Sequence, residues 1–251
     1  MQDLHIHIER GPYEKAWIDR FVAQAVKMEI DEINLLEHTV RLREFHPAFR
    51  EAGEYSLYQR RWLDGKIKTA HTLDEYRRLM DLIRSSDYPV KINFGLEVCW
   101  FEQHADFLRG LVNQCELDYV LGSVHWIDNW TFNQRKYQWL GKDVNHLYRR
   151  YYEMSNTLIE SGIFDIIAHP DLIRCHGIYP DDDLADTYRA LSQNAVKHGV
   201  MIEMNTAKGL GINPQFLQIA KEEGVTFSLG SDAHRPEDVG RRLKEVSALL
   251  A

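Results

Sequence analysis

The chain has 251 residues, of which 44% are hydrophobic and 27% are charged, and its formal net charge at pH 7 is −8. This apolar content is sufficient to bury a core and excludes a mainly disordered chain. The negative charge argues against an extended nucleic-acid interface, and no stretch approaches the roughly 20 apolar residues that a membrane-spanning helix needs.

Short β-rich runs alternate with longer helical patterns along the chain. In chain order, the predicted strands are Asp3–Ile8, Ile33–His38, Ile92–Val98, Tyr119–His125, Ile166–Asp171, Met201–Asn205 and Thr226–Asp232. Helical patterns cover Tyr13–Met28, Asp143–Ile159 and Leu184–His198, and Pro236 begins a last predicted helix that runs to Leu250. Because the first strand begins almost at Met1, no room is left for a signal peptide, and we expect a cytoplasmic protein.

This alternation indicates the fold class. Several of the strands are nearly continuous apolar runs, which is typical of parallel strands that are covered on both faces. Repeated strand–helix units without a linker predict one α/β domain over residues 1–251, folded as a closed seven-stranded parallel barrel. An open doubly wound sheet is the alternative.

One long interruption, Thr39–Ala70, separates the second strand from the next helix. It is rich in arginine and aromatic residues. A connection of this length inside a compact domain often forms a lid or a binding segment. An ordinary surface excursion with a small apolar cluster of its own is the competing interpretation.

Residues with metal-binding side chains end most of the predicted strands. His5 and His7 lie two residues apart, on one face of the first strand. The other strand ends supply His38, Glu97, His125, His169, Asp232 and His234, and the sixth strand ends in Glu203-Met204-Asn205. Because the carboxyl ends of barrel strands meet at one rim, we expect these side chains to converge.

Imidazoles and carboxylates are the usual protein ligands of zinc, manganese and iron. A lone histidine is more often a hydrogen-bonded core residue, so the hypothesis depends on the whole set. That set exceeds the roughly four to six ligands that one ion takes. It therefore predicts two or three divalent ions with a bridging carboxylate.

Six motifs in order carry a resemblance to a known family. They are Asp3-Leu4-His5-Ile6-His7, Glu37-His38-Thr39, Gly95-Leu96-Glu97, Gly122-Ser123-Val124-His125, Ala168-His169-Pro170-Asp171 and Gly230-Ser231-Asp232-Ala233-His234. With these motifs the chain resembles the PHP (polymerase and histidinol phosphatase) superfamily, and within it the monofunctional histidinol-phosphate phosphatases. The resemblance implies a distorted (β/α)7 barrel with a trinuclear metal centre.

The resemblance also implies which residues hold each ion. The implied ligands are His5, His7, Glu97 and Asp232 for one ion, Glu97 with His125 and His169 for a second, and His38 with His234 for a third. The family usually supplies one more ligand after His-x-His, and here only Glu9 can take that place. If Glu9 instead caps the following helix, the third site is weaker.

The expected reaction is hydrolysis of a small phosphate monoester, most simply L-histidinol phosphate to L-histidinol and phosphate in histidine biosynthesis. A hydroxide that bridges two ions would attack phosphorus in line. Arg174, Arg43 and Arg235 are the candidate phosphate ligands, because a guanidinium binds phosphate with two hydrogen bonds. Asp232 or His234 would protonate the leaving alkoxide.

Three alternatives stay open. A PHP-type phosphoesterase could act on phosphotyrosine or on a nucleic-acid 3′ end. An amidohydrolase-type metal hydrolase also opens with His-x-His, but it would carry a bridging lysine where this chain has Val124-His125. A metal-binding protein without activity is the third. We expect no membrane or nucleic-acid partner, and the sequence does not indicate an oligomeric state.

Overall fold

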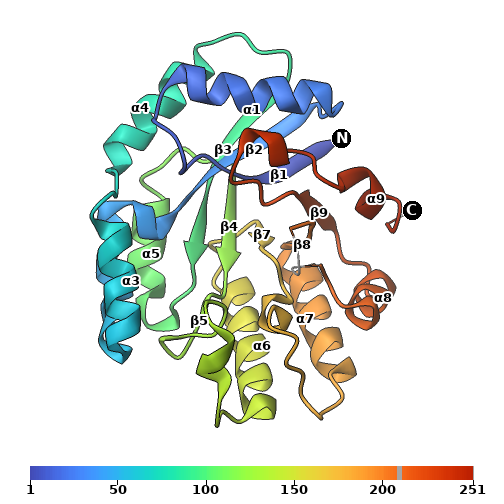
Figure 1. Cartoon of the computed structure of the whole chain (residues 1–251). Coiled ribbons are helices and arrows are strands. Elements are labelled where there is room, and N and C mark those ends of the chain that lie inside the picture. Colours follow the sequence, from blue (N-terminus) through green and yellow to red (C-terminus); the bar gives the residue numbers. More distant parts are fainter. Residues whose placement is uncertain (208–210, 251) are drawn as a thin grey trace.

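A parallel sheet of seven strands forms the centre of the molecule in the computed structural model, which describes residues 1–207 and 211–250. In their order across the sheet, the strands are β1 (Gln2–His7), β2 (Glu32–His38), β3 (Lys91–Cys99), β4 (Tyr119–Ser123), β7 (Ile166–Ile167), β8 (Met201–Asn205) and β9 (Phe227–Gly230). Each strand lies beside the next one in the sequence, as a barrel requires (Figure 1).

The first and last strands come together and nearly close the barrel. Ile6 bridges to Ala233 in parallel, and the backbone N–H of His7 donates to the carbonyl of Ala233 at 2.7 Å. The buried Asp3 carboxylate accepts from the N–H groups of Ser231 and Gly240 at 2.8 and 2.9 Å. The predicted seven-stranded barrel is therefore confirmed, with its closure nearly complete, and the open doubly wound sheet is wrong.

Amphipathic helices cover the outside of the sheet (Figure 1). They are α1 (Lys15–Lys27), α4 (Leu73–Arg84), α5 (Ala105–Val112), α6 (Val144–Glu160), α7 (Ala185–His198), α8 (Pro214–Glu222) and the short α9 (Leu243–Ser247). In α4 a capping box between Thr72 and Glu75 begins the helix, and the apolar face buries Tyr76, Leu79 and Ile83 against the sheet.

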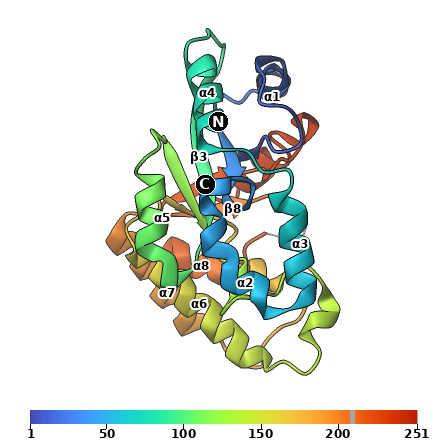
Figure 2. The same ribbon diagram turned by 90° about the vertical axis from the view of Figure 1, so that its left-hand side faces the viewer.

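The long segment after β2 is mostly helical. It comprises the 3₁₀ turns η1 (Thr39–Arg41) and η2 (Arg43–Phe49) and the helices α2 (Arg50–Tyr55) and α3 (Leu57–Ile67). Both helices lie on the side of the molecule that Figure 2 presents. After β4, the strands β5 (Trp126–Ile127) and β6 (Trp130–Thr131) form a hairpin. Its two turn residues, Asp128 and Asn129, have φ of 47° and 68°, as a type I′ turn requires.

Buried Gln59 joins α3 to this hairpin. Its Nε2 donates to the carbonyls of Ala52 and Asn129 at 2.6 and 2.8 Å, and its Oε1 accepts from the N–H of Thr131 at 3.1 Å. Trp62 of α3 also meets Trp126 edge to face, with 5.9 Å between the ring centroids. These contacts make the helix and the hairpin one packed unit.

Three predicted strands end two or more residues earlier than expected. β4 stops at Ser123, β7 at Ile167 and β9 at Gly230, so His125, His169 and Asp232 lie just beyond the strands. At two of these positions the backbone itself leaves the sheet, because His169 has φ of 29° and Asp232 has φ of 50°.

The continuous last helix from Pro236 to Leu250 is also wrong. A 3₁₀ turn, η6 (Pro236–Asp238), precedes α9, and the break falls at Gly240, whose φ is 76°. A Cβ there would lie 2.6 Å from Cδ1 of Ile30, so close packing explains the glycine. Across residues 1–207 and 211–250, no helix has both the length and the apolar content to cross a membrane.

Candidate metal centre

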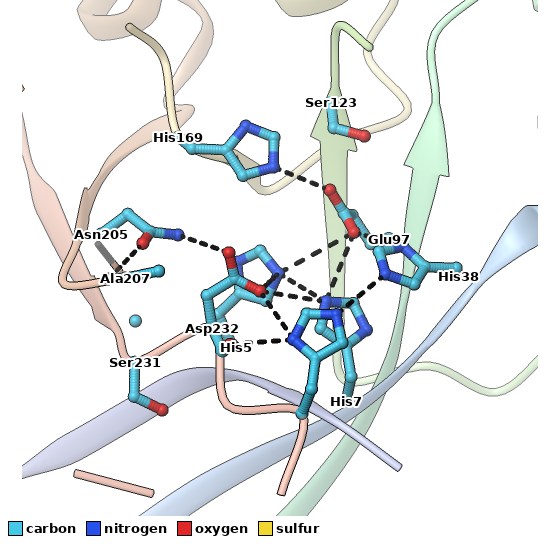
Figure 3. Close-up of polar contacts among 12 residues, drawn as sticks. His5, His7, His38, Glu97, Ser123, His169, Asn205, Ala207, Ser231 and Asp232 are labelled. Carbon is cyan, nitrogen blue, oxygen red and sulfur yellow. Dashed lines mark hydrogen bonds and ion pairs between the residues drawn. The ribbon is translucent and has the colours of Figure 1, made fainter. Parts of the chain in front are cut away.

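The ends of six strands, β1, β2, β3, β4, β7 and β9, bring the predicted ligands into one cluster, most of which Figure 3 shows. Figure 3 shows His5 and His7 of β1 facing Glu97 of β3, with Asp232 and His169 beside them. Ligand atoms lie within 4.8 Å of one another in three groups, which are His7 with His38 and His234, His5 with His7 and Glu97, and Glu97 with His125 and His169. The structure thus brings most of the predicted ligands together, although these groups contain neither Asp232 nor Glu9, and their binding of metal stays a prediction.

Glu97 is the hub of the cluster. Its Oε1 lies 2.9 Å from Nε2 of His169 and 3.5 Å from Nε2 of His125. Its Oε2 lies 2.6 Å from Nδ1 of His38 and 3.4 Å from Nε2 of His7. The carboxylate thus has one oxygen toward each half of the cluster, which is the geometry that a bridging ligand needs.

His5 presents a fixed lone pair to the cluster. Its Nδ1 lies 2.7 Å from Oε1 of buried Glu203, so the ring proton resides on Nδ1 and Nε2 is free to accept a cation. That Nε2 lies 2.9 Å from Nε2 of His7 and 3.6 Å from Oδ1 of Asp232. A cation between these atoms would satisfy all of them.

His234 is oriented in the same way. Its Nδ1 lies 3.0 Å from the carbonyl oxygen of Asp232, which can only accept, so Nδ1 carries the proton. Its Nε2 then faces Nε2 of His38 at 3.4 Å and Oε1 of Glu9 at 3.7 Å. Glu9 is therefore near the third group, and it does not cap α1, whose N-cap residue is Glu14.

The charges in the cluster also suit a bound cation. Burial disfavours a charged His5, but the carboxylates of Glu203, Asp232 and Glu97 outweigh it and raise the pKa of His5 to about 10. The pKa of His38 rises to about 9, because Glu97 and Glu9 outweigh its burial. Burial prevails at His125 and lowers its pKa to about 3. Without metal, protons on His5 and His38 balance the carboxylates, and a divalent ion would take their place.

Two imidazoles of the cluster each have one buried ring nitrogen without a partner among the residues that the structure describes. Nδ1 of His7 and Nδ1 of His169 are buried, and neither has a hydrogen-bond partner in the described part of the chain. Such atoms are rare in folded proteins. The residues present, nitrogen and oxygen donors only, suit zinc, manganese or iron.

A cavity of about 350 Å³ adjoins the cluster. His38, Glu97, His125, His169, Asp232 and His234 line it on the side of the strand ends. Side chains of the helical segment and of the hairpin region complete it, among them Phe49, Trp62, Lys66, Trp126 and Gln134. The segment Thr39–Ala70 thus contributes to the binding cavity, as one of its two interpretations required.

The three arginines predicted to bind phosphate are placed elsewhere. Nη1 of Arg174 donates to buried Asp171 at 3.0 Å, and Nε of Arg43 donates to the carbonyl of Ala70 at 3.1 Å. Arg235 is exposed. Among the described residues that line the cavity there is no arginine. A phosphate-binding role for these side chains stays a prediction, and this arrangement gives it no support.

Sequence reasoning assigned no role to two residues that support the ligands. Glu203 accepts from His5 Nδ1–H and from the backbone N–H of His169. Asn205 Nδ2 lies 3.4 Å from Oδ2 of Asp232 and 3.2 Å from Oε2 of Glu203. Both end β8 on the same face, so period-two spacing was the signal that could have identified them.

Comparisons with known proteins agree with this geometry. The family model described as PHP domain matches residues 3–207. A Deinococcus radiodurans protein named Probable histidinol-phosphatase is 33% identical over 162 residues, which are 61% of this chain and 62% of that protein. The match thus spans less than two thirds of that relative's length. A Schizosaccharomyces pombe protein of the same name is 24% identical over 89% of this chain and 76% of its own length.

A solved structure shows the same fold. It is the histidinol phosphate phosphatase of Lactococcus lactis in complex with zinc, L-histidinol and phosphate. Its TM-score against this chain is 0.69 at 17% sequence identity, over 99% of this chain and 92% of that one.

Proposed function

This chain belongs to the PHP domain family, and on that premise we propose that it is a metal-dependent phosphatase that hydrolyses L-histidinol phosphate to L-histidinol and phosphate. The single observation that carries the proposal is the convergence of three potential metal-binding groups on one cavity, with Glu97 shared between two of them. The relatives named histidinol-phosphatase support the choice of substrate. Histidine biosynthesis in the cytoplasm is the corresponding role.

Three ions, one for each group, are part of the proposal. When bound, such ions would activate water at neutral pH and neutralise charge on the phosphate oxygens. The first would be held by His5, His7, Glu97 and Asp232, the second by Glu97, His125 and His169, and the third by His38, His234 and Glu9. The Lactococcus lactis complex with zinc favours zinc as the first metal to test.

The chain itself supplies orientation and protons. Glu203 fixes the tautomer of His5, and the Asp232 carbonyl fixes that of His234, so the imidazoles need no reorganisation when the substrate binds. Asp232 and His234 both line the cavity, where either of them, when protonated and released from metal, would deliver a proton to the leaving oxygen.

The cavity also suits the leaving group. Histidinol carries an imidazole and an ammonium, which need apolar contact for the ring and acceptors for the N–H groups. Trp62 and Trp126 provide aromatic surface, and Oε1 of Gln134 is buried without a hydrogen-bond partner in the described residues. A volume of about 350 Å³ lies in the range of small-molecule sites.

A phosphatase screen tests the proposal. Protein loaded with zinc, manganese or iron is assayed on histidinol phosphate, a phosphotyrosine peptide, nucleotides and a single-stranded oligonucleotide. We expect selective release of inorganic phosphate from histidinol phosphate. Activity on the oligonucleotide or the peptide alone would replace this substrate by the other PHP-type alternatives, and no activity with any metal would overturn the proposal.

A further inference from the structure

A lysine or arginine side chain is a strong phosphate ligand, and the described residues place few of them at this cavity. Arg174 and Arg43 are hydrogen-bonded elsewhere, as described above. Arg41 is engaged as well, because its guanidinium donates to Oγ1 of Thr69 at 2.8 Å and to the carbonyl of Glu9 at 3.2 Å. Among the described residues that line the cavity, Lys66 is the only lysine or arginine.

Lys66 lies in the last turn of α3 and is half-buried. Its Nζ lies 5.5 Å from the centroid of the Trp62 ring, which itself lines the cavity. No carboxylate of the described residues lies within ion-pair distance of this amine. The Trp62 ring therefore helps to position the ammonium group, and this group can form an ion pair with a bound anion.

Lys66 lies on the same cavity as the metal-binding cluster, because His38, Glu97 and His234 line that cavity as well. Hydrogen bonds of Gln59 with Asn129 and Thr131 of the hairpin, and with Ala52, fix the position of α3.

We propose that Lys66 binds the phosphoryl group of the substrate and that α3, rather than an arginine-bearing loop, supplies the phosphate cation of this enzyme. The inference rests on the proposed phosphatase function. An ammonium group presents three donors without a fixed direction, so it can follow the phosphate oxygens as the phosphorus changes geometry. The same contact would hold inorganic phosphate after the reaction.

The test compares Lys66→Met, Lys66→Arg and the control Lys68→Met with the parent protein. Lys68 is an exposed lysine at the end of the same helix. Binding of inorganic phosphate to zinc-loaded protein, after removal of free zinc, is measured by calorimetry. KM and kcat are measured on histidinol phosphate and on p-nitrophenyl phosphate, with bound zinc and thermal melting as checks on each variant.

We expect Lys66→Met to weaken phosphate binding and to raise KM on both substrates by about tenfold or more, as loss of a charge-assisted hydrogen bond implies. Lys66→Arg should restore most of the binding, and Lys68→Met should match the parent. Unchanged phosphate binding in Lys66→Met, or no phosphate binding by the zinc-loaded parent, overturns the inference. If phosphate binding depends on Lys66 but histidinol phosphate is not hydrolysed, the lysine assignment stands and the proposed substrate falls.

Discussion

Two walls of the cavity differ in how the chain builds them. The strand-end wall comprises the metal-binding cluster, whose side chains follow strands of the sheet and hold one another through Glu97 and Glu203. The helix–hairpin wall comprises α3 and the β5–β6 hairpin, joined by Gln59 and by the contact between Trp62 and Trp126. The difference teaches that the candidate metal ligands are positioned by the sheet, whereas the other wall, to which we assign the substrate contacts, is built by a segment added between β2 and α4 and by the hairpin.

The largest expected effect is on the strand-end wall. Glu97→Gln keeps the size of the side chain but removes the charge that two metal-binding groups share. We expect loss of bound metal and at least about a thousandfold fall in kcat/KM, beyond the roughly ten- to hundredfold effect of residues that only orient ligands. Kinetics and elemental analysis of the purified variant measure both.

Glu32→Gln is the matched control for that variant. Glu32 begins β2, where it bonds to Lys91 and Asn93 at the opposite end of the strand from His38. It should retain metal and rate. A Glu97→Gln protein with full metal content and parental turnover would contradict the assignment of metal binding and catalysis to the strand-end wall.

A smaller effect is expected one contact away from the cluster. Glu203→Gln removes the charge that orients His5 and an acceptor for the His169 N–H. Metal affinity should fall about ten- to hundredfold. Competition with a fluorescent zinc chelator measures it, with the exposed Glu222→Gln on α8 as control. Unchanged zinc affinity would show that Glu203 does not contribute to metal binding and that only the ligands themselves do.

On the helix–hairpin wall we expect a change in substrate affinity rather than in chemistry. Gln59→Leu removes the three hydrogen bonds that join α3 to its surroundings. We expect a destabilisation of about 2–3 kcal/mol and a several-fold higher KM with little change in kcat. Urea unfolding and steady-state kinetics test this. The control is Gln103→Leu, since exposed Gln103 contacts the same hairpin residue, Asn129. A large fall in kcat with unchanged KM would contradict the division between the walls.

The smallest effect on activity is expected at Glu37, which lies beside the strand-end wall. Here we expect a change in the pH dependence of the free energy of unfolding. Burial, only partly offset by the hydrogen bond from Tyr13, raises the pKa of Glu37 from 4.5 to about 7. The folded state therefore holds this proton more tightly than the unfolded state. The stability that results is fully present below pH 4.5 and is lost as the pH rises through 7.

Glu37→Gln cannot ionise and should escape that loss. In metal-free protein we expect it to be more stable than the parent at pH 8 by up to about 3 kcal/mol, with a much smaller difference at pH 5. Urea unfolding at both pH values measures this. Equal stability of the two proteins at pH 8 would show that Glu37 does not ionise at a cost in the folded state.

The strand-end wall could be predicted from the sequence because it follows from residue spacing within strands and from the topology of a parallel sheet. His5 and His7 share a face by period-two spacing, and the ends of parallel strands meet at one rim wherever the helices lie. Glu9 was also placed near its group, since it follows β1 by two residues. What failed was the extent of the strands, because the left-handed backbone at His169 depends on tertiary contacts.

The helix–hairpin wall could not be predicted residue by residue. The segment after β2 is rich in arginine and aromatic residues but contains no recognisable motif. Its helices are positioned by contacts between residues far apart in the sequence, such as Gln59 and Asn129, which are 70 residues apart. The phosphate-binding role of the arginines stays a prediction, and their side-chain contacts could not be predicted for a similar reason. Asp171, three residues before Arg174, was a possible ion-pair partner, but the sequence did not show whether the guanidinium would pair with it or face the cavity.

The left-handed backbone at His169 and Asp232 has a consequence for engineering. Conformations with positive φ cost a non-glycine residue of order 1 kcal/mol or more. Glycine or asparagine at either position would therefore lower the backbone strain. A laboratory selection for heat resistance alone would favour such replacements and would discard the imidazole and the carboxylate together with the strain. Thermostable variants should therefore be sought with these two positions held constant.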